Sequence, residues 1–455
     1  MHTLEQLRSG ALAGTRRLDL SCGLRAVPPE VLDLADTLEV LNLSDNHLSD
    51  LPADLGRLHR LKVIFCSGNV FTRLPEVLGE CHALQMVGFK ANRITEVSGA
   101  ALPPALRWLT LTDNAITTLP PELGERPALQ KLLLAGNRLR TLPARLAAAQ
   151  QLELIRLAAN QLEELPGWLT ELPRLGWLAL SGNPLGWCGF DAVDGVEGAG
   201  AGAGVGVPAE LDSIAWQQLR VDALLGEGAS GHIYRVHRQG TDEVLALKLF
   251  KGDVTSDGLP EHELAACLAA GQHPALCTPC AQLSGHPDGA RGLLLPLIPP
   301  HYQNLAAPPS LDSCTRDVYP NGLRIPAAVV LRLASGMAGA LAHLHHQGVL
   351  HGDVYAHNML WNPASGEALL SDFGAATLLP SAPRLGRSLQ ALDVRAFGVL
   401  LQELLAHTEG AAPGNAASGL PAMAALARAC VCDQASERPT MADVSHQIAA
   451  ATCHT

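Results

Sequence analysis

The stretch LQKLLLAGNRLRTLP, residues 129–143, decides the fold of the first half of the chain. Its asparagine belongs to a series that recurs at spacings of 22 or 23 residues: Asn46, Asn69, Asn92, Asn114, Asn137, Asn160 and Asn183. A leucine lies eight residues before each of these asparagines, and apolar or cysteine residues lie five and three residues before it. A fixed period of this length indicates a stack of equivalent units and not an ordinary globular core.

The repeat matches the leucine-rich-repeat pattern LxxLxLxxN/C, and an earlier copy, Leu18 to Cys22, has cysteine in place of the asparagine. Each Leu-x-Leu places two apolar residues on one face of a short strand. The asparagine amide can satisfy backbone groups where the chain turns away from that strand. One repeat cannot enclose its own core, so neighbouring repeats must stack. We therefore expect an α/β leucine-rich-repeat solenoid, a horseshoe, over residues 1–190.

The strand positions that do not point inward are expected to form a concave face, the usual partner surface of such solenoids. Aromatic and cationic residues on an exposed strand face are typical of interaction hot spots. We expect a protein substrate or regulator to bind there. The candidate residues are Phe65, Lys90, Trp108, Lys131, Arg156 and Trp177.

Composition excludes several other classes of protein. The net charge of −12 argues against a primary role on nucleic acid, which favours a basic surface. The first 20 residues lack the pattern of a secretory signal. The most apolar stretch, 327–344, contains Arg332 and His343 and is expected to be a buried helix, not a membrane span. These features predict a cytoplasmic protein, in which the 11 cysteines are reduced.

Residues 191–209 are rich in glycine and alanine, and we expect them to form a flexible linker. After the linker, the sequence GEGASG over residues 226–231 follows a strand-like run and fits GxGxxG. That motif alone is weak, since dinucleotide-binding folds also contain it. A dinucleotide-binding fold would need a helix next, whereas Ile233 to Val236 continue as a strand, and a second strand ends at Lys248. Cys277 and Cys280 form a lone Cys-x-x-Cys pair between His273 and His286, which is weak evidence for zinc.

Further motifs follow in order along the second half. They are His351-Gly352-Asp353 with Asn358, then Asp372-Phe373-Gly374, then Asp393 with Gly398, and finally Glu437-Arg438-Pro439. This ordered set resembles the eukaryotic-type protein kinase family over about 240 residues. With the repeats, the chain resembles a bacterial-style, soluble leucine-rich-repeat protein kinase. The resemblance implies an α+β bilobal kinase domain over residues 210–455.

The resemblance assigns roles to individual residues. It implies that Asp353 accepts the proton of the substrate hydroxyl and that Lys248 contacts the nucleotide phosphates, held by Glu263 with Glu261 as the alternative. Asn358 and Asp372 would bind Mg²⁺ or Mn²⁺ through oxygen. The expected ATP-binding residues are Gly226, Glu227, Gly228, Ala229, Ser230, Gly231, Ile233, Ala246 and Lys248. Asp393 is expected to support the catalytic loop.

The second half also departs from the family pattern. Gly352 replaces the arginine of His-Arg-Asp, and Tyr355 replaces a lysine that meets the γ-phosphate in Ser/Thr kinases. Only 18 residues separate Gly374 from Asp393, without the Ala-Pro-Glu whose glutamate pairs with the arginine found here as Arg438. His-Gly-Asp is also similar to the catalytic loop of aminoglycoside- and choline-type phosphotransferases. Three functions therefore stay open: a protein kinase, of the Ser/Thr type by resemblance; a nucleotide-binding pseudokinase scaffold; and a small-molecule phosphotransferase.

Overall fold

The computed structural model describes residues 2–185, 211–227, 231–251, 255, 257–409 and 419–452. The predicted linker, 191–209, lies outside this part of the chain. Packing divides the chain into two compact units. The first unit is Met1–Arg174 with Asn183–Leu185, and the second is Leu175–Gly182 with Gly186–Thr455.

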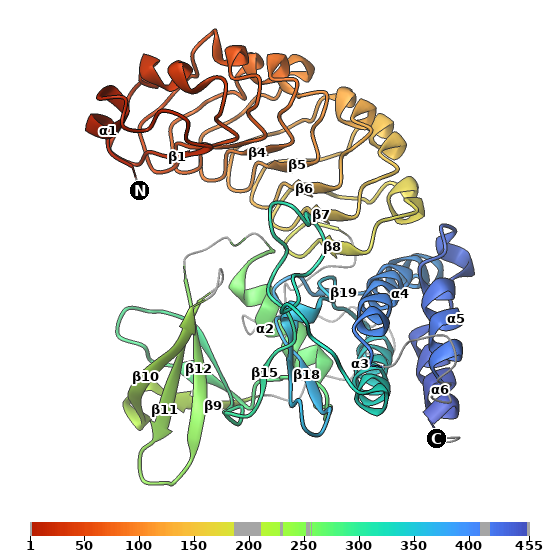
Figure 1. Cartoon of the computed structure of the whole chain (residues 1–455). Helices are drawn as coiled ribbons and strands as arrows, with labels where there is room; N and C mark the ends of the chain where they lie inside the picture. The colour runs from red at the N-terminus through yellow and green to blue at the C-terminus, as the bar shows by residue number, and fades with distance from the viewer. Residues whose placement is uncertain are drawn as a thin grey trace. The chain divides into compact units, whose positions relative to one another are not determined.

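The first unit is a leucine-rich-repeat solenoid, as the sequence predicts. Its strands pair in parallel in the order of the sequence, and short helices lie on the side away from them (Figure 1). The strands are β1 (Arg17–Asp19), β2 (Val40–Asn42), β3 (Val63–Phe65), β4 (Met86–Gly88), β5 (Trp108–Thr110), β6 (Lys131–Leu133) and β7 (Leu154–Arg156). The helices are α1 (Leu4–Arg8) and the 3₁₀ turns η1 (Pro29–Leu34), η2 (Leu55–Arg57), η3 (Glu76–Glu80), η4 (Gly99–Ala101), η5 (Pro121–Glu125), η6 (Ala144–Ala148) and η7 (Gly167–Glu171).

The asparagine of each repeat joins three backbone segments. The side-chain nitrogen of Asn137 donates to the carbonyls of Leu111 and Leu134, both at 2.9 Å, and its oxygen accepts the N–H of Ile116 at 3.0 Å. Equivalent contacts to a neighbouring repeat are made by Asn46, Asn69, Asn92, Asn114, Asn160 and Asn183. These backbone groups are buried and cannot bond to water, so they would be unsatisfied without the asparagine side chains. The ladder of amides therefore holds adjacent repeats together.

The residue before each asparagine has left-handed backbone geometry, which the repeat pattern did not predict. Glycine occupies this position in three repeats, at Gly68, Gly136 and Gly182. The other four positions hold residues with a side chain, namely Asp45, Ala91, Asp113 and Ala159, at φ between 53° and 59°. An L-residue with a Cβ is strained in this region, so Ala91 and Ala159 cost stability that glycine would not.

The second unit contains a mixed sheet in the strand order β10-β11-β12-β14-β13-β9. Its strands are β9 (Asp212–Ala215), β10 (Leu219–Glu227), β11 (Gly231–Arg238), β12 (Val244–Phe250), β13 (Ala281–Ser284) and β14 (Gly292–Pro296). Helix α2 (Pro260–Ala270) follows β12 in the chain. The side chains of Val236, Leu245, Leu247 and Leu294 form a buried core beneath this sheet. The hairpin of β10 and β11 is therefore packed on this core through Val236.

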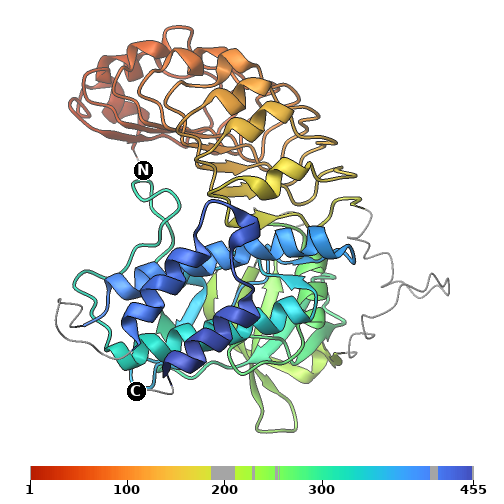
Figure 2. The same cartoon turned by 90° about the vertical axis from the view of Figure 1, so that its right-hand side faces the viewer.

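The remainder of the second unit is mainly helical. Its helices are α3 (Ala327–His346), α4 (Pro383–Ala406), α5 (Leu420–Cys430) and α6 (Met441–Thr452), with the 3₁₀ turns η9 (Ala356–Asn358) and η10 (Ala435–Glu437), whereas η8 (Trp216–Gln218) lies between β9 and β10 of the sheet. The contacts pair α3 with α6 and α4 with α5 (Figure 2). Among the short strands, β15 (Gln303–Asn304) precedes α3. Between α3 and α4 lie β16 (Val349–Leu350), β17 (Met359–Trp361), β18 (Ala368–Leu370) and β19 (Thr377–Leu378). Strand β8 (Trp177–Ala179) also belongs to this unit. A sheet-rich part and a helix-rich part give the bilobal α+β architecture that the sequence predicts.

Helix α3 is the one helix among the described residues whose length and composition would allow it to cross a membrane. Of its most apolar window, 56% is buried inside the structure. Val330, Leu333 and Met337 have no exposed surface. This burial is what a core helix shows, so its apolar composition is weak evidence for a membrane segment.

Candidate functional site

Lys248 and Glu263 form a buried ion pair between β12 and α2. The Nζ of Lys248 lies 2.5 Å from Oε1 of Glu263, and the two side chains are 13% and 5% exposed. Glu261, the alternative partner, is exposed and lies 3.7 Å from Arg291 instead. The predicted pairing of Lys248 with Glu263 is therefore the one that the structure contains.

The charges around this pair affect both ionisations. Burial lowers the pKa of Lys248, but the carboxylates of Glu263 and Asp372 outweigh it, and the pKa of Lys248 is raised overall. Burial raises the pKa of Glu263 against the attraction of Lys248, and Asp372 adds to the rise. Asp372 is thus close enough to act on both members of the pair. Because the pKa of Lys248 is raised, its ammonium stays charged.

The glycine hairpin is formed by the end of β10 and the start of β11. Gly226 pairs with Ile233 across the hairpin, and Ile233 pairs in turn with Lys248 on β12. A Cβ at Gly231 would lie 2.5 Å from the carbonyl oxygen of Leu249, so only glycine lets the strands approach this closely. Glu227 forms an ion pair with Lys251. The predicted phosphate-loop residues Gly228, Ala229 and Ser230 lie outside the described residues.

Ala246 lies on β12, two residues before Lys248, and is 8% exposed. Its backbone is paired with both neighbouring strands, to Arg235 on β11 and to Leu295 on β14. Its expected contact with ATP stays a prediction.

Asp353 and Asn358 contact each other in the loop between β16 and β17. The side-chain nitrogen of Asn358 donates to Oδ2 of Asp353 at 2.8 Å and to its backbone carbonyl at 3.0 Å. Asn358 is 6% exposed, whereas Asp353 is half-buried. The carboxylate of Asp353 is thus held in one orientation while part of its surface stays open to solvent.

Asp372 is placed next to this loop by β18. Ser371, the residue before it, donates both its N–H and its hydroxyl to the backbone carbonyl of Asn358, at 2.9 and 2.8 Å. Asp372 itself has left-handed geometry, at φ 59°, and its Oδ1 accepts the N–H of Gly374 at 3.1 Å. A non-glycine residue in this conformation is strained, and such strain is concentrated at functional sites.

Asp393 anchors the catalytic loop from α4. Its Oδ2 accepts the N–H of His351 at 2.9 Å and its Oδ1 accepts the N–H of Gly352 at 2.9 Å. The Nε2 of His345 lies 3.1 Å from Oδ2 of the same carboxylate, which has no exposed surface. The predicted supporting role of Asp393 is confirmed by these contacts.

The structure also explains how the chain accommodates its short segment after Asp372-Phe373-Gly374. Only residues 375–382 lie between this motif and α4, which begins at Pro383 and already contains Asp393. Arg438, which is 1% exposed, donates Nε to the carbonyl of Cys432 and Nη1 to that of Ala391, both at 2.9 Å. Two backbone carbonyls thus accept the hydrogen bonds of Arg438, the arginine that pairs with a glutamate in the family pattern.

Two further acid–base contacts lie beside the site and were missed from the sequence. Asp317 accepts the backbone N–H of His357 at 3.1 Å, and its Oδ1 lies 2.7 Å from Nδ1 of the same residue. Burial lowers the pKa of His357, but the bond and charge of Asp317 outweigh it and raise the pKa overall. Tyr319 donates to Glu403 at 3.0 Å. Burial, together with Asp317, raises the pKa of Glu403 to about 7. Asp317 and Tyr319 stand in a stretch without periodicity, so no sequence signal marked them.

The predicted partner-binding residues divide into two groups. Phe65, Lys90 and Trp108 are half-buried, and the Nζ of Lys131 lies 4.1 Å from the ring centre of Trp108. Lys131, Arg156 and Trp177 are 8%, 3% and 2% exposed, so they do not present the open surface that we expected. Trp177 in particular packs within the second unit, because its indole donates to the carbonyl of Val354.

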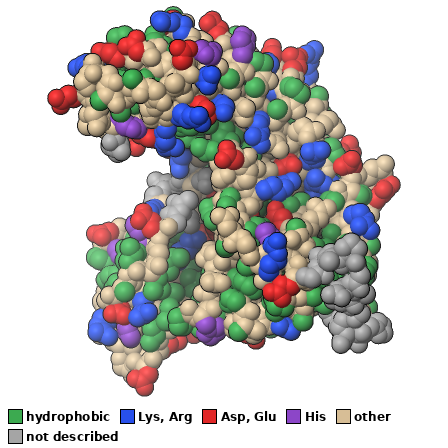
Figure 3. Space-filling model, viewed as in Figure 1, with side chains coloured by type: hydrophobic (Ala, Val, Ile, Leu, Met, Phe, Trp, Pro, Cys, Tyr) green, Lys and Arg blue, Asp and Glu red, His purple; other side chains and the backbone are tan. Residues whose placement is uncertain are grey.

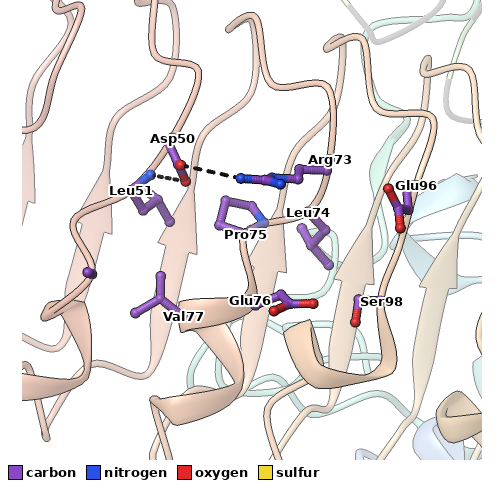
Figure 4. Close-up of a pocket in the computed structure, with 10 residues that line it drawn as sticks. Asp50, Leu51, Arg73, Leu74, Pro75, Glu76, Val77, Glu96 and Ser98 are labelled. Carbon is purple, nitrogen blue, oxygen red and sulfur yellow. Dashed lines mark hydrogen bonds and ion pairs between the residues drawn. The ribbon is translucent and has the colours of Figure 1, made fainter.

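Other surface features do not form a second candidate site. A pocket in the first unit lies between successive repeats. It is lined by the exposed ion pair of Asp50 and Arg73, whose charged atoms are 3.9 Å apart (Figure 4). Acidic and basic side chains are interspersed over the visible face (Figure 3). Among the described residues, no group of three or more His, Cys, Asp or Glu side chains could hold a metal ion. Cys280 instead donates to the carbonyl of Leu294, so the zinc interpretation lacks support.

Comparison with known proteins agrees with this geometry. Residues 219–396 match the protein kinase domain family, and residues 37–58 and 127–185 match leucine-rich-repeat families. The chain is 38% identical over 79 residues to the calmodulin-binding receptor kinase CaMRLK of Arabidopsis thaliana, which covers 17% of this chain and 12% of that protein. It is 26% identical over 153 residues to a probable cyclin-dependent serine/threonine-protein kinase of Dictyostelium discoideum, which covers 34% and 22%.

A third relative is cyclin-dependent kinase B2-1 of Arabidopsis thaliana, at 23% identity over 155 residues, or 33% of this chain and 48% of that protein. The chain thus spans less than half the length of each of these relatives. What the matches establish is a protein kinase domain together with leucine-rich repeats.

Proposed function

We propose that this chain, which carries a protein kinase domain and leucine-rich repeats, is an ATP-dependent protein kinase directed at serine or threonine. The observation that carries the proposal is the buried pair of Lys248 and Glu263, with Asp372 acting electrostatically on both. Asp372 follows Ser371, whose hydroxyl donates to the backbone carbonyl of Asn358, and the side chain of Asn358 donates to Asp353. Residues from four separate elements thus form one site with a fixed cation and oriented carboxylates.

Each residue has a distinct part in phosphoryl transfer. Catalysis of this reaction consists mainly of positioning and charge neutralisation. Lys248, kept in place by Glu263, donates to phosphate oxygens of the nucleotide. Asp353, oriented by Asn358, accepts the proton of the attacking hydroxyl, a contribution of about 10²- to 10⁴-fold in typical enzymes.

A protein kinase domain binds its nucleotide together with a divalent metal ion, and the side chains present here fit Mg²⁺ or Mn²⁺. The carboxylate of Asp372 and the amide of Asn358 supply oxygen, the ligand atom that Mg²⁺ prefers. The side-chain nitrogen of Asn358 is bonded to Asp353, so its oxygen is the atom that can face the ion. When bound, the ion neutralises negative charge on the phosphates.

The assignment to serine or threonine is supported by the Dictyostelium relative, which is described as a serine/threonine-protein kinase. Leucine-rich repeats are protein-interaction modules. We propose that the half-buried strand residues Phe65, Lys90 and Trp108 contribute to the surface that binds a protein substrate or regulator. Lys131 lies against Trp108 and is expected to hold that ring in place.

The proposal is tested by phosphate transfer from γ-labelled ATP, with Mg²⁺ or Mn²⁺, to the chain itself and to generic protein substrates. Wild-type protein should incorporate label, and Asp353→Asn should lose it by at least about 100-fold with ATP affinity nearly unchanged. Asp288→Asn, on an exposed loop of the same unit, is the matched control and should behave as wild type.

Two results would contradict the proposal. Nucleotide binding without any incorporation of label would favour a pseudokinase scaffold. Transfer to a small aminoalcohol or aminoglycoside, but to no protein, would favour the small-molecule phosphotransferase.

A further inference from the structure

Strand β8 packs against the catalytic loop and α4 within the second unit. By sequence pattern, Leu175 to Gly182 carry the strand of the last repeat, yet their packing groups them with the kinase residues. Gly176 lies against α4, where a Cβ would be 3.5 Å from the backbone nitrogen of Ala396. Trp177 is 2% exposed, so this tryptophan is a fully packed part of the unit.

Two consecutive residues of β8 hold the loop on both sides of Asp353. The indole Nε1 of Trp177 donates to the carbonyl of Val354 at 2.9 Å, and its ring stacks on Tyr355 with centres 4.4 Å apart and planes at 9°. The N–H of Leu178 donates to the carbonyl of Gly352 at 3.2 Å. The residues before and after the catalytic aspartate are therefore both bonded to the same short strand.

Gly352 is what makes this approach possible. Its φ of 72° is left-handed, and a Cβ there would lie 2.3 Å from the carbonyl oxygen of Leu178 and 3.0 Å from that of Ala375. Any larger residue, including the arginine of the family pattern, would push β8 away from the loop. The close packing of β8 therefore requires glycine at position 352, and this glycine in turn allows β8 to pack there.

Burial within the loop shows which of its parts β8 covers. Gly352, Val354 and Tyr355 are buried, whereas Asp353 between them is only half-buried. The strand therefore covers the backbone of the loop and leaves part of the carboxylate surface accessible. That arrangement supports the catalytic residue and does not seal it.

From these contacts we propose that residues 175–182 compensate for the short activation segment and the missing arginine, and that Trp177 is a positioning residue for Asp353. The inference rests on the proposed kinase activity. Only residues 375–382 remain between the Asp372 motif and α4, and their strand β19 pairs with β16, which precedes the loop. Without β8, the loop would lose two hydrogen bonds and one aromatic stack next to its catalytic residue.

The test is a steady-state comparison of full-length wild type with Trp177→Ala and Trp177→Phe, titrating ATP. We expect Trp177→Ala to lower kcat at least about tenfold while the KM for ATP stays within about twofold, since misplacement of a catalytic group lowers turnover more than binding. Trp177→Phe keeps an aromatic ring on Tyr355 and should recover most of the lost kcat. Trp168→Ala is the matched control, because Trp168 lies in η7 of the first unit.

A second variant keeps the test decisive if Trp177→Ala does not fold. Gly352→Ala introduces the Cβ that would meet Leu178, and the same fall in kcat is expected. Wild-type or higher kcat in either folded variant would overturn the inference, and a higher value would mean that β8 obstructs the site. An inactive wild type with an equally inactive Asp353→Asn would instead refute the proposed function.

Discussion

Replacing Asp393 by asparagine should weaken the support of the catalytic loop without changing the residues that are proposed to react. In the structure, one oxygen of Asp393 accepts from His351 and faces His345, and the other accepts from Gly352. An asparagine has only one acceptor oxygen. If it keeps the contact with His351, its NH₂ group faces the N–H of Gly352, and two donors then oppose each other in a site with no exposed surface.

The cost follows from these bonds. Leaving the N–H of Gly352 buried and unsatisfied costs about 1–3 kcal/mol. Changing the bond from His351 from a charged to a neutral acceptor costs about 1 kcal/mol more. The sum of about 2–4 kcal/mol corresponds to a fall in Tm of roughly 6–12 °C for a unit of this size.

The assay is thermal unfolding of full-length wild type and Asp393→Asn, following the transition that ATP with Mg²⁺ raises, because binding stabilises the unit that binds. Asp288→Asn is the control and should shift that transition by less than about 2 °C, as expected for an exposed residue. If Asp393→Asn melted within about 2 °C of wild type and retained its kcat, the anchoring role of Asp393 would be refuted.

Three other predictions address the ion pair, the repeats and a buried carboxyl. Lys248→Met should weaken ATP binding by about tenfold or more, because it removes a charged donor and leaves Glu263 buried without its partner. Equal ATP affinity of the variant and wild type, measured by calorimetry, would contradict this. Lys62→Met, at an exposed lysine, is the control. Ala91→Gly should stabilise the first unit by about 0.5–1 kcal/mol, because glycine relieves the left-handed strain at this position. Ala53→Gly, at a position without positive φ, is the control and should not stabilise it. If both variants changed the free energy of urea unfolding equally, the explanation would be wrong. Glu403 has its pKa raised from 4.5 to about 7 by burial and Asp317, so its protonated form favours the folded state at low pH, and this contribution is lost as pH rises through about 7. Relative to Glu403→Gln, wild type should therefore lose up to about 3 kcal/mol of unfolding free energy between pH 4.5 and 8; parallel stability profiles would argue against this assignment.

The repeats could be predicted from sequence because their physics is local and periodic. An asparagine every 22 or 23 residues predicts both the strand positions and the amide ladder that the structure contains. The left-handed residue before each asparagine escaped prediction, since alanine and aspartate there give no compositional signal. Only Gly68, Gly136 and Gly182 hinted at it.

In the kinase unit, the motifs point to residue types that the chemistry requires, and the roles of those residues stay predictions. Lys248, Glu263, Asp353 and Asn358 were identified from their motifs, and the structure places them in contact as pairs. The contact of Trp177 with Tyr355 was not foreseen, because the two residues stand 178 positions apart and neither belongs to a pairing motif. The sequence did mark Gly352 as anomalous, but only the structure shows the strand that requires it.

The most direct test of the account is titration of wild-type protein with ATP in the presence and absence of Mg²⁺. The account predicts saturable binding with a Kd at or below about 1 mM, the usual range for enzyme substrates, and weaker binding once the ion is chelated. Protein that is folded, yet takes up no nucleotide at millimolar ATP with Mg²⁺ or Mn²⁺, would contradict it.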